Sequence, residues 1–172
     1  MKFLSVVIIL TFGFYAVQAQ NIKNNSKFNI AFIKFFEGDW SGVGQFSNGK
    51  KIEAEASFKL SLDSCWVIYT HTDKAPNSYK SVSVWGIDKL TGKFLDYIFD
   101  NFQGHRLFNS DGWESGRLVL VNKVNMPTGT STFERFTYLK TGADKFKMSY
   151  EVSNDEITWR LGDFVDFIKN TN

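Results

Sequence analysis

The sequence predicts an all-β domain, a single antiparallel up-and-down β-barrel of about ten strands preceded by one short helix. Turn signals such as Asn48-Gly49 and Thr91-Gly92 recur every ten to fifteen residues beyond residue 38. Between the turns, apolar and polar residues alternate, most clearly over 51–60, as in a half-buried antiparallel strand. So long a meander leaves two unpaired edges unless it closes into a barrel. A β-sandwich is the alternative, and the short hairpin turns favour the barrel.

The first nineteen residues have the pattern of a signal peptide. Lys2 precedes an apolar run of about 15 residues, and small residues at 17–19 precede a polar segment. This run is shorter than the roughly 20 residues that span a bilayer. We therefore expect a cleaved signal peptide at 1–19, a flexible lead-in at 20–27 and the barrel domain at 28–172. The protein is then exported, periplasmic or secreted, with no stable membrane span after cleavage.

Residues 28–36 predict the single helix, because apolar side chains recur there and Gly38 follows them. The alternating segments and their turns then predict ten strands in succession. These strands lie near 39–47, 50–60, 65–72, 80–88, 93–99, 104–109, 113–123, 130–140, 144–152 and 157–167.

The composition narrows the function classes. The formal net charge is +2 and the basic residues form no long run, so we expect no nucleic-acid partner. Cys65 is the only cysteine, which excludes an internal disulfide, and we expect its thiol to be buried. The sequence has two histidines, His71 and His105. No potential metal ligand follows or precedes them at the spacing of a known metal motif, so we expect no metal site. We assign no catalytic residue, since no nucleophile motif or carboxylate pair is present.

A short motif, Gly-x-Trp-x-Gly-x-Gly, follows the expected helix. Trp40, Gly42 and Gly44 share the inward face of the first strand if it alternates regularly. The missing side chains at Gly42 and Gly44 let that strand bend and another segment approach closely. We therefore expect Trp40 to close one end of the barrel.

With the segment Trp85-Gly86-Ile87-Asp88 and the turn Thr91-Gly92-Lys93, this layout resembles the lipocalin-like (calycin) barrels. It looks nearest to the nitrobindin-like and the uncharacterised bacterial lipocalin-like domain families. In lipocalins an arginine of the last strand covers the tryptophan, so the resemblance implies that Arg160 stacks on Trp40.

Nitrobindin-like proteins bind haem through a histidine late in the chain. Here no histidine follows His105, so the resemblance assigns haem to no residue. Met148 or Tyr150 could replace that ligand in principle, and a place in the core or the pocket wall is their simpler interpretation. We therefore expect no cofactor.

Aromatic residues make up 17% of the chain, which suits either a packed core or the wall of a ligand pocket. The candidates for such a wall, together with a rim histidine, are Trp66, Trp85, Tyr97, Tyr138, Tyr150 and His105.

Two arginines fall inside expected strands. If Arg117 and Arg135 face inward, each needs a partner, which could be the acidic group of a ligand. If they face outward, each can pair across strands with Glu114 or Glu134. Both faces of these strands carry apolar groups, so the sequence leaves both orientations open.

The leading functional hypothesis is non-catalytic: an exported protein that binds a small hydrophobic or amphipathic ligand in its barrel. The first alternative is an isomerase or hydrolase that uses His105 with an acidic residue. The second alternative is a surface interaction module with a packed barrel. A binder needs a cavity of roughly 300 Å³ or more. An enzyme needs His105 inside that cavity, and an interaction module needs an exposed apolar patch.

Overall fold

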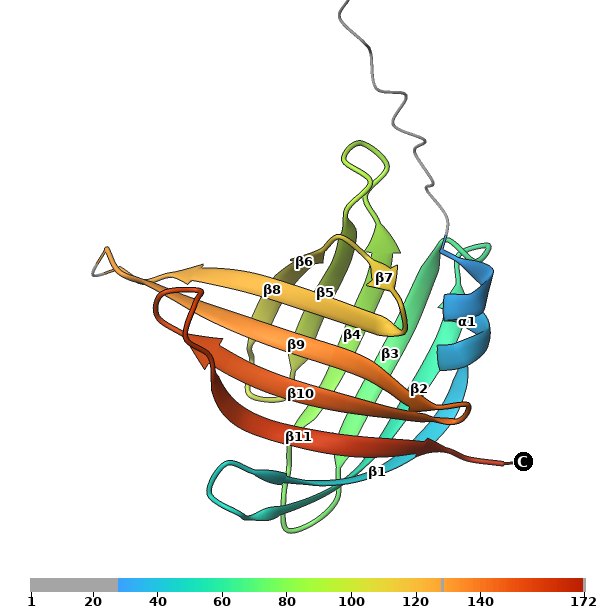
Figure 1. The fold of residues 1–172 in the computed structure, drawn as a ribbon, viewed down its shortest axis with the longest axis horizontal. Helices are drawn as coiled ribbons and strands as arrows, with labels where there is room; N and C mark the ends of the chain where they lie inside the picture. The colour runs from blue at the N-terminus through green and yellow to red at the C-terminus, as the bar shows by residue number, and fades with distance from the viewer. Residues whose placement is uncertain (1–27, 128, 172) are drawn as a thin grey trace, which may run out of the picture.

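The computed structural model describes residues 28–127 and 129–171. It forms a closed antiparallel barrel of ten strands with one short helix, and an eleventh strand of two residues, Trp113–Glu114, pairs at its edge (Figure 1). The all-β barrel is confirmed, and the sandwich alternative is not. The expected signal peptide at 1–19 and lead-in at 20–27 lie outside the described residues. The elements in chain order are α1 (Ile30–Phe36), β1 (Gly38–Phe46), β2 (Lys51–Ser61), β3 (Trp66–Asp73), β4 (Lys80–Ile87), β5 (Phe94–Asp100), β6 (His105–Ser110), β7 (Trp113–Glu114), β8 (Arg117–Asn125), β9 (Ser131–Gly142), β10 (Lys145–Ser153) and β11 (Arg160–Lys169).

Strands that follow one another in the chain pair with each other, except β6 and β7, and two further pairings close the sheet. The strands β1 and β11 pair over seven residue positions, from Trp40↔Lys169 onward. The strands β6 and β8 pair at Asn109↔Val121 alone. The barrel therefore has a continuous join at β1–β11 and a weak seam at β6–β8.

One expected strand divides in two. The segment predicted as 113–123 contains the short strand β7 and the longer strand β8, which form a hairpin with each other. Ser115 and Gly116 lie between them with φ angles of 51° and 81°, which reverses the chain within two residues.

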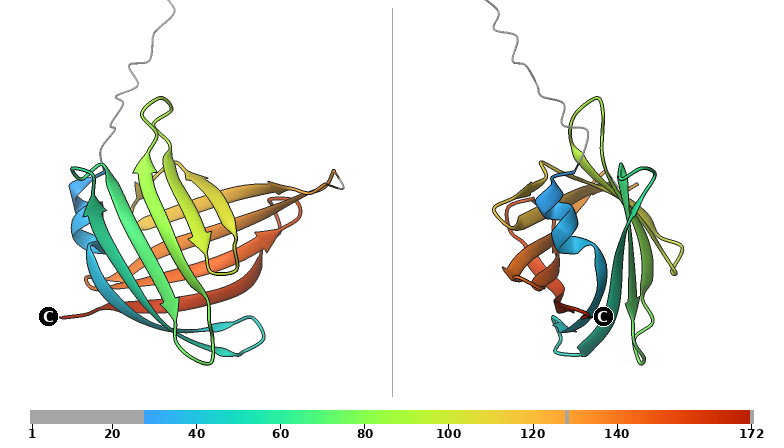
Figure 2. Two further views of the ribbon diagram at one scale, coloured as in Figure 1. Left: turned by 180° about the vertical axis from the view of Figure 1, so that it is seen from behind. Right: turned by 90° about the vertical axis from the view of Figure 1, so that its right-hand side faces the viewer.

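The helix α1 plugs one end of the barrel, here called the helix end (Figure 2). Asn29 caps it, because its Oδ1 accepts a hydrogen bond from the Ala31 N–H at 2.7 Å. Phe32 and Phe36 point into the barrel and are 1% exposed. Trp40 is fully buried beside them and donates its Nε1–H to the Phe36 carbonyl at 2.8 Å. The expected closure by Trp40 therefore occurs at this end.

Gly42 and Gly44 lie where β1 and β11 approach most closely. A Cβ on Gly44 would lie 1.9 Å from the Phe164 carbonyl oxygen, and one on Gly42 would lie 2.5 Å from Val165 Cγ1. Since no side chain fits in either space, these glycines allow β11 to pack against the bent first strand, as the motif predicted.

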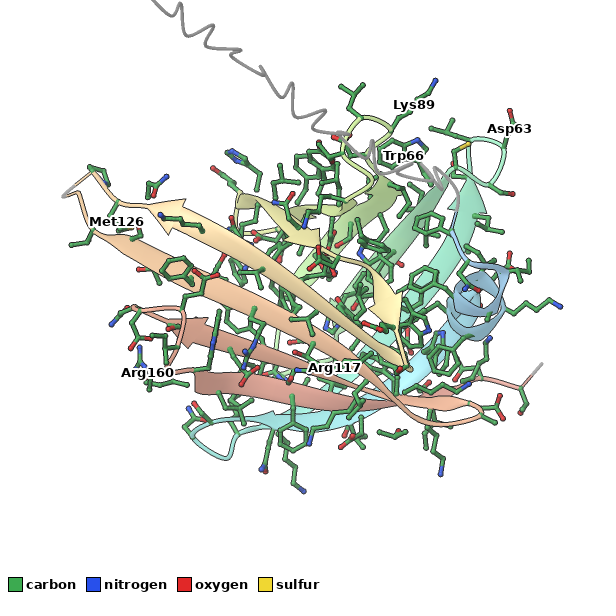
Figure 3. The ribbon with its side chains drawn as sticks, turned by 45° about the horizontal axis from the view of Figure 1, so that its top comes forward. Asp63, Trp66, Lys89, Arg117, Met126 and Arg160 are labelled. Atoms are coloured by element: carbon green, nitrogen blue, oxygen red, sulfur yellow. The ribbon has the colours of Figure 1, made fainter. Side chains whose placement is uncertain are left out.

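The expected stacking of Arg160 on Trp40 is wrong. Because β11 runs antiparallel to β1, Trp40 stands opposite Lys169, whereas Arg160 begins β11 at the far end. Lys169 Nζ lies 5.2 Å from the Trp40 ring and donates to the Phe35 carbonyl at 2.9 Å. Figure 3 shows Arg160 on the same side as Met126, away from Asp63, Trp66 and Lys89.

Cys65 is exposed, contrary to the expectation of a buried thiol. It ends the turn between β2 and β3, in which three consecutive residues, 62–64, have positive φ angles. Within the described residues, no helix is both long and apolar enough to cross a membrane.

Candidate ligand-binding site

A cavity of about 400 Å³ occupies the end of the barrel opposite α1, here called the open end. The loops after β1, β3, β5, β8 and β10 surround this end, and the cavity wall comes from β1–β6 and β9–β11. The helix end is filled by aromatic side chains, so the hollow part is confined to the other half. A volume of this size is in the range of small-molecule sites.

Aromatic side chains form much of the cavity wall. Tyr79 stacks on Phe102 at the rim, with ring centroids 6.2 Å apart. Phe136 packs against Tyr150 at 5.0 Å on the opposite side. Tyr138 is 1% exposed and lines the inner part of the cavity. These rings give an apolar surface that carries hydroxyl groups at its edges.

Three consecutive inward positions of β3 form a hydrogen-bonded chain. Burial raises the pKa of the Tyr69 hydroxyl well above its ordinary value, so this hydroxyl stays protonated. It shares a hydrogen bond of 3.2 Å with His71 Nδ1, in which the donor is set by the protonation of the ring. His71 Nε2 then donates to Asp73 Oδ1 at 2.9 Å. Both ring nitrogens of His71 are thus occupied within the protein.

Arg106 lies at the centre of a second polar network, on the inward face of β6. Its guanidinium contacts Asp100 Oδ2 at 3.3 Å, Glu134 Oε1 at 3.4 Å and the Tyr79 hydroxyl at 3.1 Å. Glu134 also accepts hydrogen bonds from Tyr150, at 2.7 Å, and from the amide of Asn122, at 2.9 Å. This network joins five strands and crosses the β6–β8 seam from within.

Two further inward carboxylates have no hydrogen bond or ion pair within the described residues. Asp163 lines the cavity from β11, and burial raises its pKa to about 6, which His71 partly opposes and Asp73 reinforces. Asp96 is fully buried on β5, and burial raises its pKa to about 7. The Trp85 indole and Ser83 hydroxyl oppose that rise, although neither reaches hydrogen-bonding geometry with Asp96.

Of the residues predicted for the pocket wall, Tyr138 and Tyr150 line the cavity. Trp85 is fully buried in the aromatic core beneath it. Trp66 and Tyr97 face outward, and Trp66 covers the space that a side chain on Gly86 would need. His105 is exposed on the outer face of β6. The expectation that these residues line one pocket is thus met only in part.

Both arginine candidates lie outside the barrel. Arg117 is exposed and stands opposite Glu114 in the β7–β8 hairpin. Arg135 pairs with Glu151 at 2.8 Å, and its guanidinium lies 4.0 Å from the centre of the Trp159 ring. The outward orientation is therefore correct for both, and Glu151, rather than Glu134, is the partner of Arg135.

Sequence reasoning missed His71, Asp73, Arg106 and Asp163 as cavity residues. A usable signal exists on β3, where Val67, Tyr69, His71 and Asp73 alternate with exposed or half-buried residues. The same alternation places Arg106 in phase with Phe108 on β6. For Asp163, the in-phase residues are Val165 and Phe167 of β11.

The residues present do not fit a haem iron held by histidine. His71 is the histidine that lines the cavity, and both of its ring nitrogens already form hydrogen bonds. Tyr150, one possible substitute, donates its hydroxyl to Glu134. Across 28–127 and 129–171, no three His, Cys, Asp or Glu side chains are grouped as a metal site.

Comparison with known proteins supports the fold. No family model matches the chain, and no curated protein sequence matches it. Among solved structures, the crystal structure of Rv2717c from M. tuberculosis is similar, with a TM-score of 0.58 at 9% sequence identity. The match covers 82% of this chain and 96% of that chain. At this identity the likeness extends to the fold alone, and the fold of this chain is that of a lipocalin-like β-barrel.

Proposed function

We propose that this protein binds a small, partly apolar molecule in the cavity at the open end of its barrel. The cavity itself carries the proposal: it encloses about 400 Å³ behind aromatic walls, while the opposite end of the barrel is packed. A barrel built only for stability would gain from filling this space, because each void forfeits packing contacts.

Two features favour binding over catalysis. His105, the basis of the enzyme hypothesis, is exposed on the outer face and does not line the cavity. His71 does line it, but both ring nitrogens are held by Tyr69 and Asp73, so neither is free to take a substrate proton.

Two finer statements belong to the same proposal. The apolar run within residues 1–19 supports export to a periplasm or out of the cell. The Gly-x-Trp-x-Gly-x-Gly motif supports a place nearest the nitrobindin-like and uncharacterised bacterial lipocalin-like domains, without the haem of the former.

The test uses a neutral fluorescent probe, N-phenyl-1-naphthylamine, whose emission rises in apolar surroundings. Ser83→Phe fills the cavity, because Ser83 lines it and is 1% exposed. The matched control is Val82→Phe, which adds the same ring on the outer face of the same strand. Circular dichroism and thermal unfolding check that both variants fold, and Ile98→Trp supplies a second filled cavity.

We expect the probe to bind the wild-type protein and Val82→Phe alike, and the filled variants at least about tenfold more weakly. Equal binding by the filled variants, or no binding by the wild-type protein, would contradict the proposal. Loss of binding in Val82→Phe alone would instead favour the surface interaction hypothesis, because Val82 and its cross-strand neighbour Phe99 are exposed apolar residues there.

A further inference from the structure

The cavity is acidic, although its surface is mostly apolar. Its lining includes the carboxylates Asp73 and Asp163 and the cations Lys50 and Arg106. Arg106 is already matched, because Asp100 and Glu134 both contact its guanidinium. The charge left over inside the cavity is therefore negative.

Asp163 is the carboxylate best placed to meet a ligand. It sits on the inward face of β11, opposite Tyr150 in register, and lines the cavity. The titratable groups that face it are His71 and Asp73 of β3, and neither forms an ion pair with it. Lys50 lines the same cavity and is exposed. Asp163 is thus held in a low-dielectric site without a donor from the described part of the chain.

Asp96 differs from Asp163 in this respect. It does not line the cavity, and the Ser83 hydroxyl and the Trp85 indole beside it are donors that the protein itself supplies. Buried polar groups in native proteins are nearly always hydrogen-bonded, and Asp163 is the carboxylate that lines the cavity without such a neighbour within the described residues. Asp163 is therefore the acceptor that a ligand can reach.

We propose that the ligand is a cationic amphiphile, with a protonated amine that pairs with Asp163 and an apolar part that lies deeper in the cavity. This inference rests on the proposed function and names the chemical class of ligand. Tyr79 and Phe102, stacked at the rim, present ring faces that favour a cation. Ile98, Met148 and Val165 line the inner part of the cavity and suit an alkyl or aryl group.

An acidic ligand fits the same cavity poorly. Arg106 has two of its five N–H groups left without a partner within the described residues, at Nε and Nη1, but its charge is already balanced by two carboxylates. A ligand carboxylate would also approach Asp73 and Asp163, and like charges in a poorly solvated site repel strongly. The arrangement therefore selects against an acidic ligand, the class that an inward Arg117 or Arg135 would have held.

The experiment compares three ligands of equal chain length, octylammonium, octan-1-ol and octanoate, as competitors of N-phenyl-1-naphthylamine near pH 7.5. The variants are Asp163→Asn and the matched control Asp166→Asn, which removes a carboxyl from the outward face of the same strand. Asparagine has nearly the shape of aspartate, and thermal unfolding checks that both variants fold.

We expect octylammonium to bind the wild-type protein at least about tenfold more tightly than octanoate, with octan-1-ol in between. Asp163→Asn should weaken octylammonium about tenfold and leave octan-1-ol unchanged, whereas Asp166→Asn should change neither. Tighter binding of octanoate, or an octylammonium affinity that survives Asp163→Asn, would overturn the cationic ligand.

The two proposals fail in different ways. If the probe binds in the cavity and octylammonium shows no preference, the binding function stands and the ligand class is wrong. If the probe binds neither the wild-type protein nor the Asp166→Asn control, the binding function itself is wrong. The comparison among ligands on the wild-type protein decides the ligand class even if Asp163→Asn does not fold.

Discussion

Asp96 and Asp163 are unusual residues in this barrel, because each carries a carboxyl group inside without a hydrogen-bonding partner from the described residues. Removing a carboxylate from water disfavours its charged form, and this is why burial raises both pKa values. The folded protein therefore holds these protons more tightly than the unfolded chain does. Stability must then depend on pH.

The direction in which stability changes with pH follows from the pKa of Asp96, which burial raises from 3.8 to about 7. The stability contributed by its proton is complete below about 3.8 and is lost as the pH rises through about 7. In Asp96→Asn no carboxyl group ionises at this position, so the variant does not lose this stability as the pH rises. We expect the free energy of unfolding of the variant, relative to wild type, to rise by up to roughly 2–3 kcal/mol between about pH 5 and about pH 8.

Urea unfolding at both pH values measures this difference. Asp166→Asn controls for the loss of a carboxyl group, because Asp166 is exposed on β11. A difference between Asp96→Asn and wild type that stays constant across the pH range would show that Asp96 has a partner in solution.

Gly44 tests the close approach of β1 and β11. A methyl group there would collide with the Phe164 carbonyl oxygen, since its carbon would lie 1.9 Å away. We expect Gly44→Ala to lower the free energy of unfolding by about 3 kcal/mol or more. Gly142→Ala is the control, because its Cβ would meet ordinary contacts at 3.5 Å, and it should change stability by less than about 1 kcal/mol. Equal losses of stability in Gly44→Ala and Gly142→Ala would contradict the close approach of β1 and β11.

Individual residues were predictable where local spacing decides their orientation. Trp40, Gly42 and Gly44 follow one another at intervals of two residues. Once the strand's inward face was assigned correctly, all three residues were placed on it. Arg160 was not predictable in this way, because its distance from Trp40 depends on how β11 pairs with β1. Arg117 and Arg135 were ambiguous because apolar residues such as Val119 and Val121 also occur on the outer face.

At the scale of elements, the β6–β8 seam is the least supported join of the barrel. One residue pair connects the two strands, whereas β1 and β11 are paired along most of their length. The Arg106 network crosses this seam, since Arg106 belongs to β6, Asn122 to β8 and Glu134 to β9. We therefore interpret Arg106 as a structural tie across the seam.

Arg106→Met should open the seam and destabilise the barrel. It leaves Asp100 and Glu134 without their counter-charge, and its side chain is 20% exposed, so we expect a loss of roughly 2 kcal/mol. Amide hydrogen exchange should accelerate most in β6 and β8. Lys74→Met, which breaks the exposed Lys74–Glu55 pair, should cost less than about 1 kcal/mol. Unchanged exchange in β6 and β8 would refute the tie.

The strands themselves were largely predictable, because turn residues and period-two alternation recur throughout 38–169. The error at 113–123 has a physical cause. Ser115 adopts a positive φ that its residue type does not announce, and Gly116 alone is a weak turn signal next to a run of apolar residues. The seam was not predictable, since closure depends on the curvature of the whole sheet.

The whole molecule consists of a packed half and a hollow half. Phe36 in the packed half contacts Phe58, Trp85 and Phe146 and is 1% exposed. Phe36→Ala should therefore cost roughly 3–5 kcal/mol of stability. It should leave the affinity for N-phenyl-1-naphthylamine unchanged, because Phe36 does not line the cavity at the open end.

Ile30→Ala is the control for that substitution, because Ile30 is 67% exposed on the same helix and should change stability by less than about 0.5 kcal/mol. A parallel fall in stability and probe affinity in Phe36→Ala would mean that the two halves do not act independently.

At this scale the sequence predicted a closed barrel large enough for a ligand, and the structure provides the cavity. The charge of the cavity was not predictable, because it depends on which carboxylates are already paired. Glu134 and Asp163 look alike in the sequence, yet Glu134 accepts three hydrogen bonds and Asp163 accepts none from the described residues.

The most direct test of the binding site is a crystal structure of the protein grown with N-phenyl-1-naphthylamine. We predict electron density for its rings inside the open end, between Tyr79 and Phe136, with α1 and the helix end unchanged. Ordered water alone in the cavity, with the probe on the outer face of β4–β6, would contradict the account and point to a surface interaction module.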